Sequence, residues 1–117
     1  MQPLKIEESE IRSGIKYIKF MGVLDASGQD DVLALESKIN TYGPKTIALF
    51  DFEGLTYLNS FAIGYIAHWY HFLKNIGGEI VILKPQPQVV DVLSVLGMTN
   101  IFKIFDSQEA ALEALQK

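Results

Sequence analysis

Cysteine is absent from the 117-residue sequence. Disulfide bonds, thiolate metal sites and thiol nucleophiles are therefore excluded. No apolar run approaches the roughly 20 residues that a membrane-spanning helix needs. The N-terminal segment is polar and acidic, unlike a signal peptide. These features predict a cytoplasmic protein without membrane insertion.

Positive charge is also scarce. The chain has 10 Lys and Arg against 14 Asp and Glu, a net charge of −4, and Arg12 is its single arginine. The lysines are scattered, whereas binding to a phosphate backbone needs a concentrated basic patch. Nucleic acid is therefore not an expected partner.

What is present is enough apolar sequence for one domain, residues 1–117, because 49% of the residues are hydrophobic. Alternating or short apolar runs predict strands at 4–8, 15–21, 46–52, 79–84 and 101–105. Helical spacing and stop signals predict helices at 30–39, 60–75, 87–96 and 106–115, with a loop at 53–59. The order ββαβαβαβα predicts an α/β fold: a mixed sheet with an N-terminal hairpin strand at one edge and βαβ crossovers.

Signals for an enzyme are weak. His68 and His71 can share a helix face, but zinc needs at least a third ligand and the chain has no further His or Cys. No third residue completes a triad with Ser60, and no glycine-rich loop with a lysine is suited to phosphate. We expect no catalytic residue, no metal and no cofactor.

One acidic feature leaves an alternative open. Asp51 ends a predicted buried strand, as the phospho-acceptor of a two-component receiver domain does, and Lys84 is the only candidate for the lysine of such a site. The pair Asp30 and Asp31 fits better as first-turn residues of a helix, where the helix dipole favours acidic side chains.

Ser60 precedes the central helix and is predicted as its N-cap, with a hydroxyl that accepts a hydrogen bond from a first-turn N–H. Asp106 is predicted in the same way to open the last helix, in a capping box with Glu109. A second interpretation of Ser60 is phosphorylation. A phosphate at a helix N-terminus meets a favourable dipole and adds about −1.5 to −2 units of charge.

The central helix carries two apolar stripes. The first is a natural core stripe and consists of Ile63, Ile66, Ala67, Tyr70 and Leu73. The second consists of Phe61, Tyr65, His68, Trp69 and Phe72. In a three-layer sandwich the second stripe would face solvent, and so many exposed aromatic residues are typical of a protein interface. We therefore predict that it binds a partner; the alternative is that another element covers part of it.

Three segments resemble the STAS domain family, specifically the bacterial anti-sigma factor antagonists. Residues 20–39 resemble its second strand, Gly-Glu-Leu-Asp segment and first helix, with Asp25 at the Asp. Residues 47–66 resemble the strand, loop and helix start around its Asp-Ser-Ser/Thr-Gly-Leu-Gly signature, and residues 74–112 resemble its C-terminal half. The resemblance covers nearly the whole chain and implies a STAS-like mixed sheet.

In that family, an anti-sigma factor that is a GHKL-type serine kinase phosphorylates the first Ser of the signature. The unphosphorylated antagonist binds the anti-sigma factor and frees the sigma factor. Ser60 matches the phospho-acceptor and Gly64 the final Gly, whereas Asn59, Phe61 and Ala62 replace the Asp, the second Ser/Thr and the first Gly. The resemblance thus implies a partner-switching regulator of transcription with Ser60 as the switch.

The predicted partner-binding set combines both arguments and consists of Asp25, Asn59, Ser60, Phe61, Tyr65, His68, Trp69 and Phe72. A phosphatase and a homodimer are left open as further partners. Two alternatives remain. One is a non-phosphorylated STAS scaffold module of a larger signalling or lipid-transport complex, suggested by the altered signature. The other is a small-molecule or nucleotide site where polar residues gather at the carboxyl ends of the strands.

Overall fold

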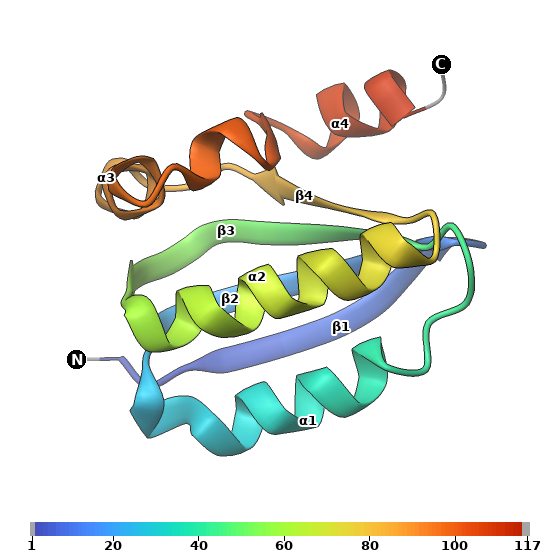
Figure 1. Cartoon of the computed structure of the whole chain (residues 1–117). Coiled ribbons are helices and arrows are strands. Elements are labelled where there is room, and N and C mark those ends of the chain that lie inside the picture. Colours follow the sequence, from blue (N-terminus) through green and yellow to red (C-terminus); the bar gives the residue numbers. More distant parts are fainter. Residues whose placement is uncertain (1, 116–117) are drawn as a thin grey trace.

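The computed structural model describes residues 2–115 (Figure 1). Its sheet has the strand order β1-β2-β3-β4-β5. The strands are β1 (Lys5–Arg12), β2 (Ile15–Leu24), β3 (Ile47–Leu58), β4 (Glu79–Leu83) and β5 (Lys103–Phe105). The helices are α1 (Gln29–Ile39), α2 (Ser60–Asn75), α3 (Pro87–Val95) and α4 (Gln108–Leu115), with short 3₁₀ turns at Ala26–Gly28 and Met98–Asn100.

The pairing of the strands confirms the predicted mixed sheet. The edge strand β1 is antiparallel to β2, with which it forms a hairpin. All other neighbouring pairs, β2 with β3, β3 with β4 and β4 with β5, are parallel. The helices between the parallel strands are the crossovers that this geometry requires.

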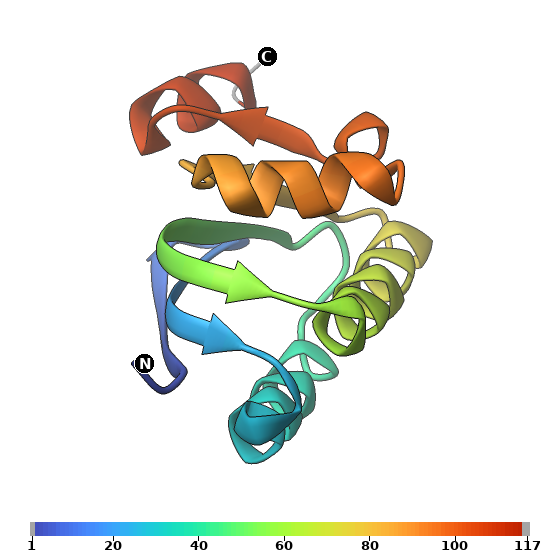
Figure 2. The ribbon, with the colours of Figure 1, turned by 90° about the vertical axis from the view of Figure 1, so that its left-hand side faces the viewer.

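Helices α1, α2 and α3 all pack against the main core on one face of the sheet. Figures 1 and 2 show α1 and α2 side by side across it. Beneath them lies the main core, built from Phe20, Phe50 and Phe52 of the sheet and closed by residues such as Leu35 and Trp69. A smaller cluster on the other face joins α4 to the sheet, with Ala111 packed among Ile15, Leu49, Val81 and Leu83.

The third strand is longer than predicted. Residues 53–59 were expected to form a loop, but β3 runs to Leu58, and β2 likewise continues to Leu24. The two strands stay paired through two irregularities in register, one of them beside Gly22, whose φ is 88°. A bulge of this kind breaks the two-residue alternation by which a strand is recognised in sequence. The extension carries the chain directly to the start of α2.

The other elements follow the predicted spacing with small shifts. Gly97 adopts the left-handed conformation, with φ of 74°, and ends the third helix as expected. The prediction for the start of the last helix was wrong by one residue, because Ser107 and not Asp106 accepts the hydrogen bond, with its Oγ 3.1 Å from the N of Ala110.

Candidate functional site

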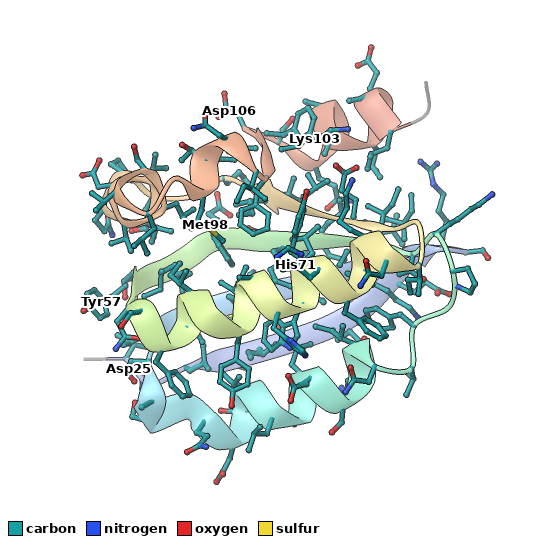
Figure 3. The ribbon with its side chains drawn as sticks, viewed as in Figure 1. Asp25, Tyr57, His71, Met98, Lys103 and Asp106 are labelled. Atoms are coloured by element: carbon teal, nitrogen blue, oxygen red, sulfur yellow. The ribbon has the colours of Figure 1, made fainter. Side chains whose placement is uncertain are left out.

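The carboxyl ends of β2 and β3 bring together three of the predicted site residues. Leu24 and Leu58 are paired in register, so Asp25 and Asn59 follow at the same edge of the sheet. Figure 3 shows Asp25 and Tyr57 at this end of the molecule, where α2 begins. Ser60 comes next in the chain and opens α2.

Asn59, and not Ser60, caps α2. The Oδ1 of Asn59 accepts hydrogen bonds from the N–H groups of Phe61 at 3.1 Å and Ala62 at 3.4 Å. Asn59 has extended backbone angles, as an N-cap residue requires, because β3 delivers the chain in that conformation. The prediction of a Ser60 cap was therefore wrong by one position.

This shift changes the chemistry available to Ser60. It is the first residue of α2 and is exposed. Within residues 2–115, no side-chain hydrogen bond involves its hydroxyl. The hydroxyl is therefore accessible for modification, and a change there would leave the cap of the helix in place.

Beside Ser60 lies an apolar groove of about 410 Å³ between the end of β3 and α3. Its walls include Tyr57, Leu58 and Ser60 on one side and Asp91, Val92 and Val95 on the other. Val95 is 85% exposed and Tyr57 is 48% exposed, and both are large apolar residues. Exposed apolar surface of this kind marks sites of interaction.

The sequence interpretation missed this groove. The segment that became α3 contains more apolar residues than one buried stripe requires, since only Val89 and Leu93 of this helix are fully buried. The surplus at Val92 and Val95 was the available signal. The sequence alone did not turn this signal into a predicted groove, because the groove depends on where α3 lies relative to β3.

Several acidic side chains lie at the carboxyl end of the sheet. Asp30 and Asp31 lie in the first turn of α1, as predicted, and Asp91 lines the groove. Asp25 is engaged locally: its Oδ1 accepts from the N of Ser27 at 2.9 Å and from the Ser27 Oγ at 2.5 Å. Among the described residues, Lys84 is directed elsewhere, toward Asp51 and Glu53.

The predicted exposure of the aromatic stripe on α2 is wrong for its central residue. Trp69 is only 1% exposed, and Phe61, Tyr65 and Phe72 are partly buried against the core. The rings form a chain into the interior, with centroids 5.1 Å apart for Phe61 and Tyr65 and 5.9 Å apart for Tyr65 and Trp69. Because α1 lies alongside α2 on the same face, it covers this side of the helix.

The outward face of α2 is instead formed by Ser60, Gly64 and His68, which are all exposed and four residues apart. Of the predicted stripe, only His68 lies there. Gly64 has no atom within 4 Å of the position that a Cβ would occupy, so the surface at Gly64, one turn from Ser60, is open. A partner that meets α2 from outside would meet these three residues.

The surroundings of Asp51 do not fit the alternative of a phospho-acceptor site like that of a two-component receiver domain. Asp51 lies within β3 rather than at its end and is 2% exposed. Its carboxylate accepts hydrogen bonds from the Tyr17 hydroxyl and, at 2.9 Å, from the N of Glu53. Lys84 does approach, with its Nζ 3.7 Å from Oδ2. Burial and the negative charge of Asp51 both raise the pKa of the Tyr17 hydroxyl, which stays protonated and bonded. The carboxylate is thus a structural group rather than an open acceptor.

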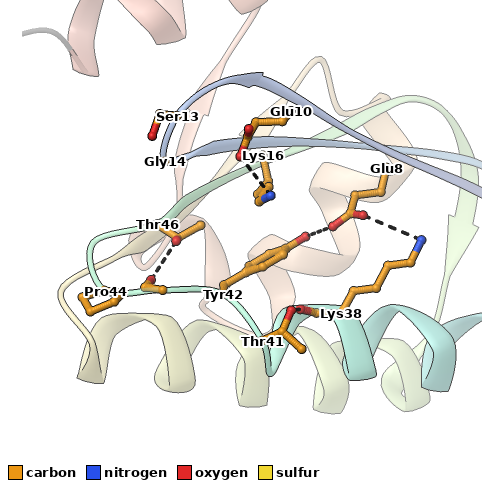
Figure 4. Close-up of a pocket in the computed structure, with 11 residues that line it drawn as sticks. Glu8, Glu10, Ser13, Gly14, Lys16, Lys38, Thr41, Tyr42, Pro44 and Thr46 are labelled. Atoms are coloured by element: carbon orange, nitrogen blue, oxygen red, sulfur yellow. Dashed lines mark hydrogen bonds and ion pairs between the residues drawn. The ribbon is translucent and has the colours of Figure 1, made fainter.

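A second hollow, of about 450 Å³, lies at the opposite edge of the sheet (Figure 4). Its charged side chains are paired with one another. The Nζ of Lys16 is 2.9 Å from Glu10, and the Nζ of Lys38 is 3.7 Å from Glu8, which also accepts a hydrogen bond from the Tyr42 hydroxyl. These contacts tie β1 to the end of α1, which is a structural role.

Two further features bear on the kind of site. Between residues 2 and 115, no group of three or more His, Cys, Asp or Glu side chains is arranged to hold a metal ion. His68 and His71 are both exposed on α2. None of the described helices has the length and apolar character needed to cross a membrane.

Comparison of the fold defines the class of α/β domain. The structure matches the anti-sigma factor antagonist SpoIIAA in its unphosphorylated form with a TM-score of 0.79 over 96% of both chains, at 18% identity. It matches SpoIIAA in the phosphorylated form with a TM-score of 0.74, at 20% identity, over 95% of this chain and 99% of that one. It also matches part of the murine Slc26a9 anion transporter, with a TM-score of 0.72, at 18% identity, over 90% of this chain but only 18% of the transporter. At these identities the likeness concerns the fold.

Sequence comparison then identifies the family. A family model described as STAS domain matches residues 8–111, and the chain belongs to the STAS domain family. The anti-sigma F factor antagonist of Paenibacillus polymyxa is 26% identical over 110 residues, which cover 93% of each chain. The TM1081 homolog of Thermotoga neapolitana is 31% identical over 75 residues, which cover 64% of each chain.

Proposed function

We propose that this protein is an anti-sigma factor antagonist that binds an anti-sigma factor, itself a GHKL-type serine kinase, at the surface where α2 begins. Phosphorylation of Ser60 switches this binding off. The observation that carries the proposal is the position of Ser60, exposed as the first residue of α2, in the wall of an apolar groove and next to a separate capping residue. The names of the Paenibacillus relative and of SpoIIAA support the class of partner.

The electrostatics of the site support an off-switch. A phosphate on Ser60 stands at the positive end of the helix dipole, so the fold tolerates it. The same phosphate borders the apolar groove and lies on an edge that already carries Asp91. A partner that covers the groove would have to bury a dianion next to a carboxylate, and desolvation and repulsion oppose this.

The departures from the family signature are compatible with the switch. Asn59 supplies the cap that an Asp would supply. Ala62 is buried, and the ring of Phe61 packs on Tyr65 rather than over the groove. These replacements serve internal packing and leave the Ser60 hydroxyl accessible.

The direct test is phosphate transfer. The purified chain is incubated with labelled ATP and a GHKL-type anti-sigma factor kinase from the same organism. We expect one phosphate per chain, which Ser60→Ala abolishes. Ser94→Ala, at an exposed serine of α3, is the matched control and should be phosphorylated normally. Incorporation that persists in Ser60→Ala would refute the switch.

The docking surface is tested separately. Because Val95 is largely exposed, Val95→Asp should leave the thermal midpoint within about 2 °C of the parent, as surface changes usually do. It should weaken binding of the kinase at least about tenfold, since it places a charge in the apolar contact. Leu33→Asp, at an exposed position of α1, is the control and should bind normally. Equal binding by both variants would exclude the groove as the contact.

A second candidate is a scaffold module that is never phosphorylated. The match to a segment of the Slc26a9 transporter favours it, because the same fold there forms a small part of a larger chain. Binding of the physiological partner would then be equal for the parent, Ser60→Ala and Ser60→Glu. A loss of binding with Ser60→Glu alone favours the switch.

A further inference from the structure

The end of β3 lacks a neighbouring strand on one side. The last paired residues of β3 and β4 are Asp51 and Leu83, whereas β3 continues to Leu58. From Glu53 onward, its backbone is paired with β2 only. Carbonyl groups on the other side of this extension need donors from elsewhere.

Two glutamine side chains supply these donors. The Nε2 of Gln86 donates to the carbonyl O of Glu53 at 2.7 Å, and the Nε2 of Gln88 donates to the carbonyl O of Thr56 at 3.0 Å. The Nε2 of Gln88 also donates to the Oε1 of Gln86 at 2.7 Å, so the two amides orient each other. The pair therefore substitutes for a missing strand over the segment that leads to Ser60.

Both glutamines belong to the element that forms the opposite wall of the groove. Gln86 is the N-cap residue of α3, and Gln88 lies in its first turn. One turn further on, α3 supplies Asp91 and Val92 to the groove. The glutamine bonds thus connect the two walls directly.

We infer that Gln86 and Gln88 are positioning residues of the Ser60 site: they fix the extension of β3 against α3 and thereby set the width of the groove and the placement of Ser60. The significance of this placement rests on the proposed function, but the geometry does not. The bonds are exposed to solvent, so their loss opens the site locally while the core stays folded.

Hydrogen exchange of the whole chain tests the local opening. In the double variant Gln86→Ala/Gln88→Ala, the backbone amide hydrogens of residues 54–63 should exchange about tenfold faster than in the parent. The exchange rates of the amides in β1 and β4 should be unchanged. Gln88→Glu keeps the size of the side chain but removes its N–H donors, and should show part of the effect. Gln29→Ala, at an exposed position of α1, is the control.

A chemical probe tests the placement of residue 60. Because the chain has no cysteine, Ser60→Cys introduces a single thiol. A helix N-terminus lowers the pKa of a thiol below its usual value of about 8.5. The apparent pKa of this thiol, taken from the pH dependence of its alkylation by iodoacetamide, should lie below that value when Ser60→Cys is the only change. It should shift upward when Ser60→Cys is combined with the double glutamine variant.

Exchange and alkylation profiles that match the parent, or exchange that rises equally over the whole sheet, would overturn the inference. Neither readout requires a kinase or a partner. Failure of this test therefore leaves the phosphorylation test unaffected, and failure of phosphorylation leaves the positioning role standing.

Discussion

The indole N–H of Trp69 donates to the Oε1 of Glu36 at 3.2 Å, a bond that joins α2 to α1. On its other side, the Trp69 ring packs edge-on against Phe50 of the sheet, with centroids 6.1 Å apart. Trp69 is thus a point of contact between two helices and the sheet. The aromatic residues of α2 serve to hold this layer together, and the proposed partner surface is the outward face of the helix with Ser60, Gly64 and His68.

Trp69→Ala should therefore destabilise the fold. Loss of a fully buried tryptophan costs about 3–5 kcal/mol, which lowers the thermal midpoint by more than about 10 °C in a domain of this size. Calorimetry checks the shift. His68→Ala, on the outward face of the same helix, is the matched control and should change the midpoint by no more than about 2 °C. Similar midpoints for both variants would mean that Trp69 is not part of the core.

The N-terminal cap of α2 is the basis of a second prediction. Asn59→Ala should lower the free energy of unfolding by about 1 kcal/mol, because the N–H groups of Phe61 and Ala62 lose their acceptor. Asn59→Asp should retain the cap, and Ser60→Ala should be nearly neutral. Urea unfolding of the three variants measures the differences. A larger loss for Ser60→Ala than for Asn59→Ala would reverse the assignment of the cap.

Gly64 makes a third prediction, which separates stability from binding. It lies in the exposed second turn of α2, with open space where a Cβ would stand. Gly64→Ala should stabilise the chain by about 0.5–1 kcal/mol, because alanine loses less backbone entropy in a helix. If the partner approaches the open surface at Gly64, the same change should weaken its binding. Isothermal titration with the partner, alongside urea unfolding, checks both signs; tighter binding would contradict the proposed contact.

Alkaline pH provides a fourth prediction. Burial, followed by the hydrogen bond to Glu8, raises the pKa of Tyr42 well above its usual value of about 10. Above that pH the unfolded chain releases the phenolic proton while the folded chain keeps it. The stability that this group contributes is thus complete below about pH 10 and falls at higher pH, by at most about 1.4 kcal/mol per pH unit.

Urea unfolding at several pH values from 8 to 11 measures this slope. Tyr42→Phe should show a shallower decline above pH 10, because it has no phenol to ionise at that position. Tyr17, whose pKa is also raised, still contributes to the remaining slope. A decline as steep as that of the parent would show that Tyr42 is not the responsible group.

Element types were predictable from the sequence because periodicity and stop signals are local. Gly97 and the start of α2 at Ser60 are examples in which one or two residues suffice. The identity of the α2 cap was not predictable in this way, because Asn59 and Ser60 are both good caps. The choice between them depends on where β3 ends, and that end depends on pairing with β2, a segment about 35 residues away along the chain.

The prediction of which side of α2 is exposed was wrong for a related reason. Helical spacing places Trp69 three residues after Ile66, on an adjacent part of the helix surface, but does not show which neighbour covers each part. That depends on the placement of α1, which follows from the strand order. The apolar groove formed by Tyr57 and Val95 was missed because its two walls are far apart in sequence and meet only in the folded chain.

The part of β3 beyond β4 has a practical consequence for protein engineering. Residues 53–58 extend past the end of β4, with β2 paired in parallel on one side and two glutamine amides on the other. The side chains of Glu53 and Thr56 are exposed there, whereas Leu55 and Leu58 belong to the main core. The exposed positions of this extension are thus suited to carry altered recognition residues while Leu55 and Leu58 keep their core contacts.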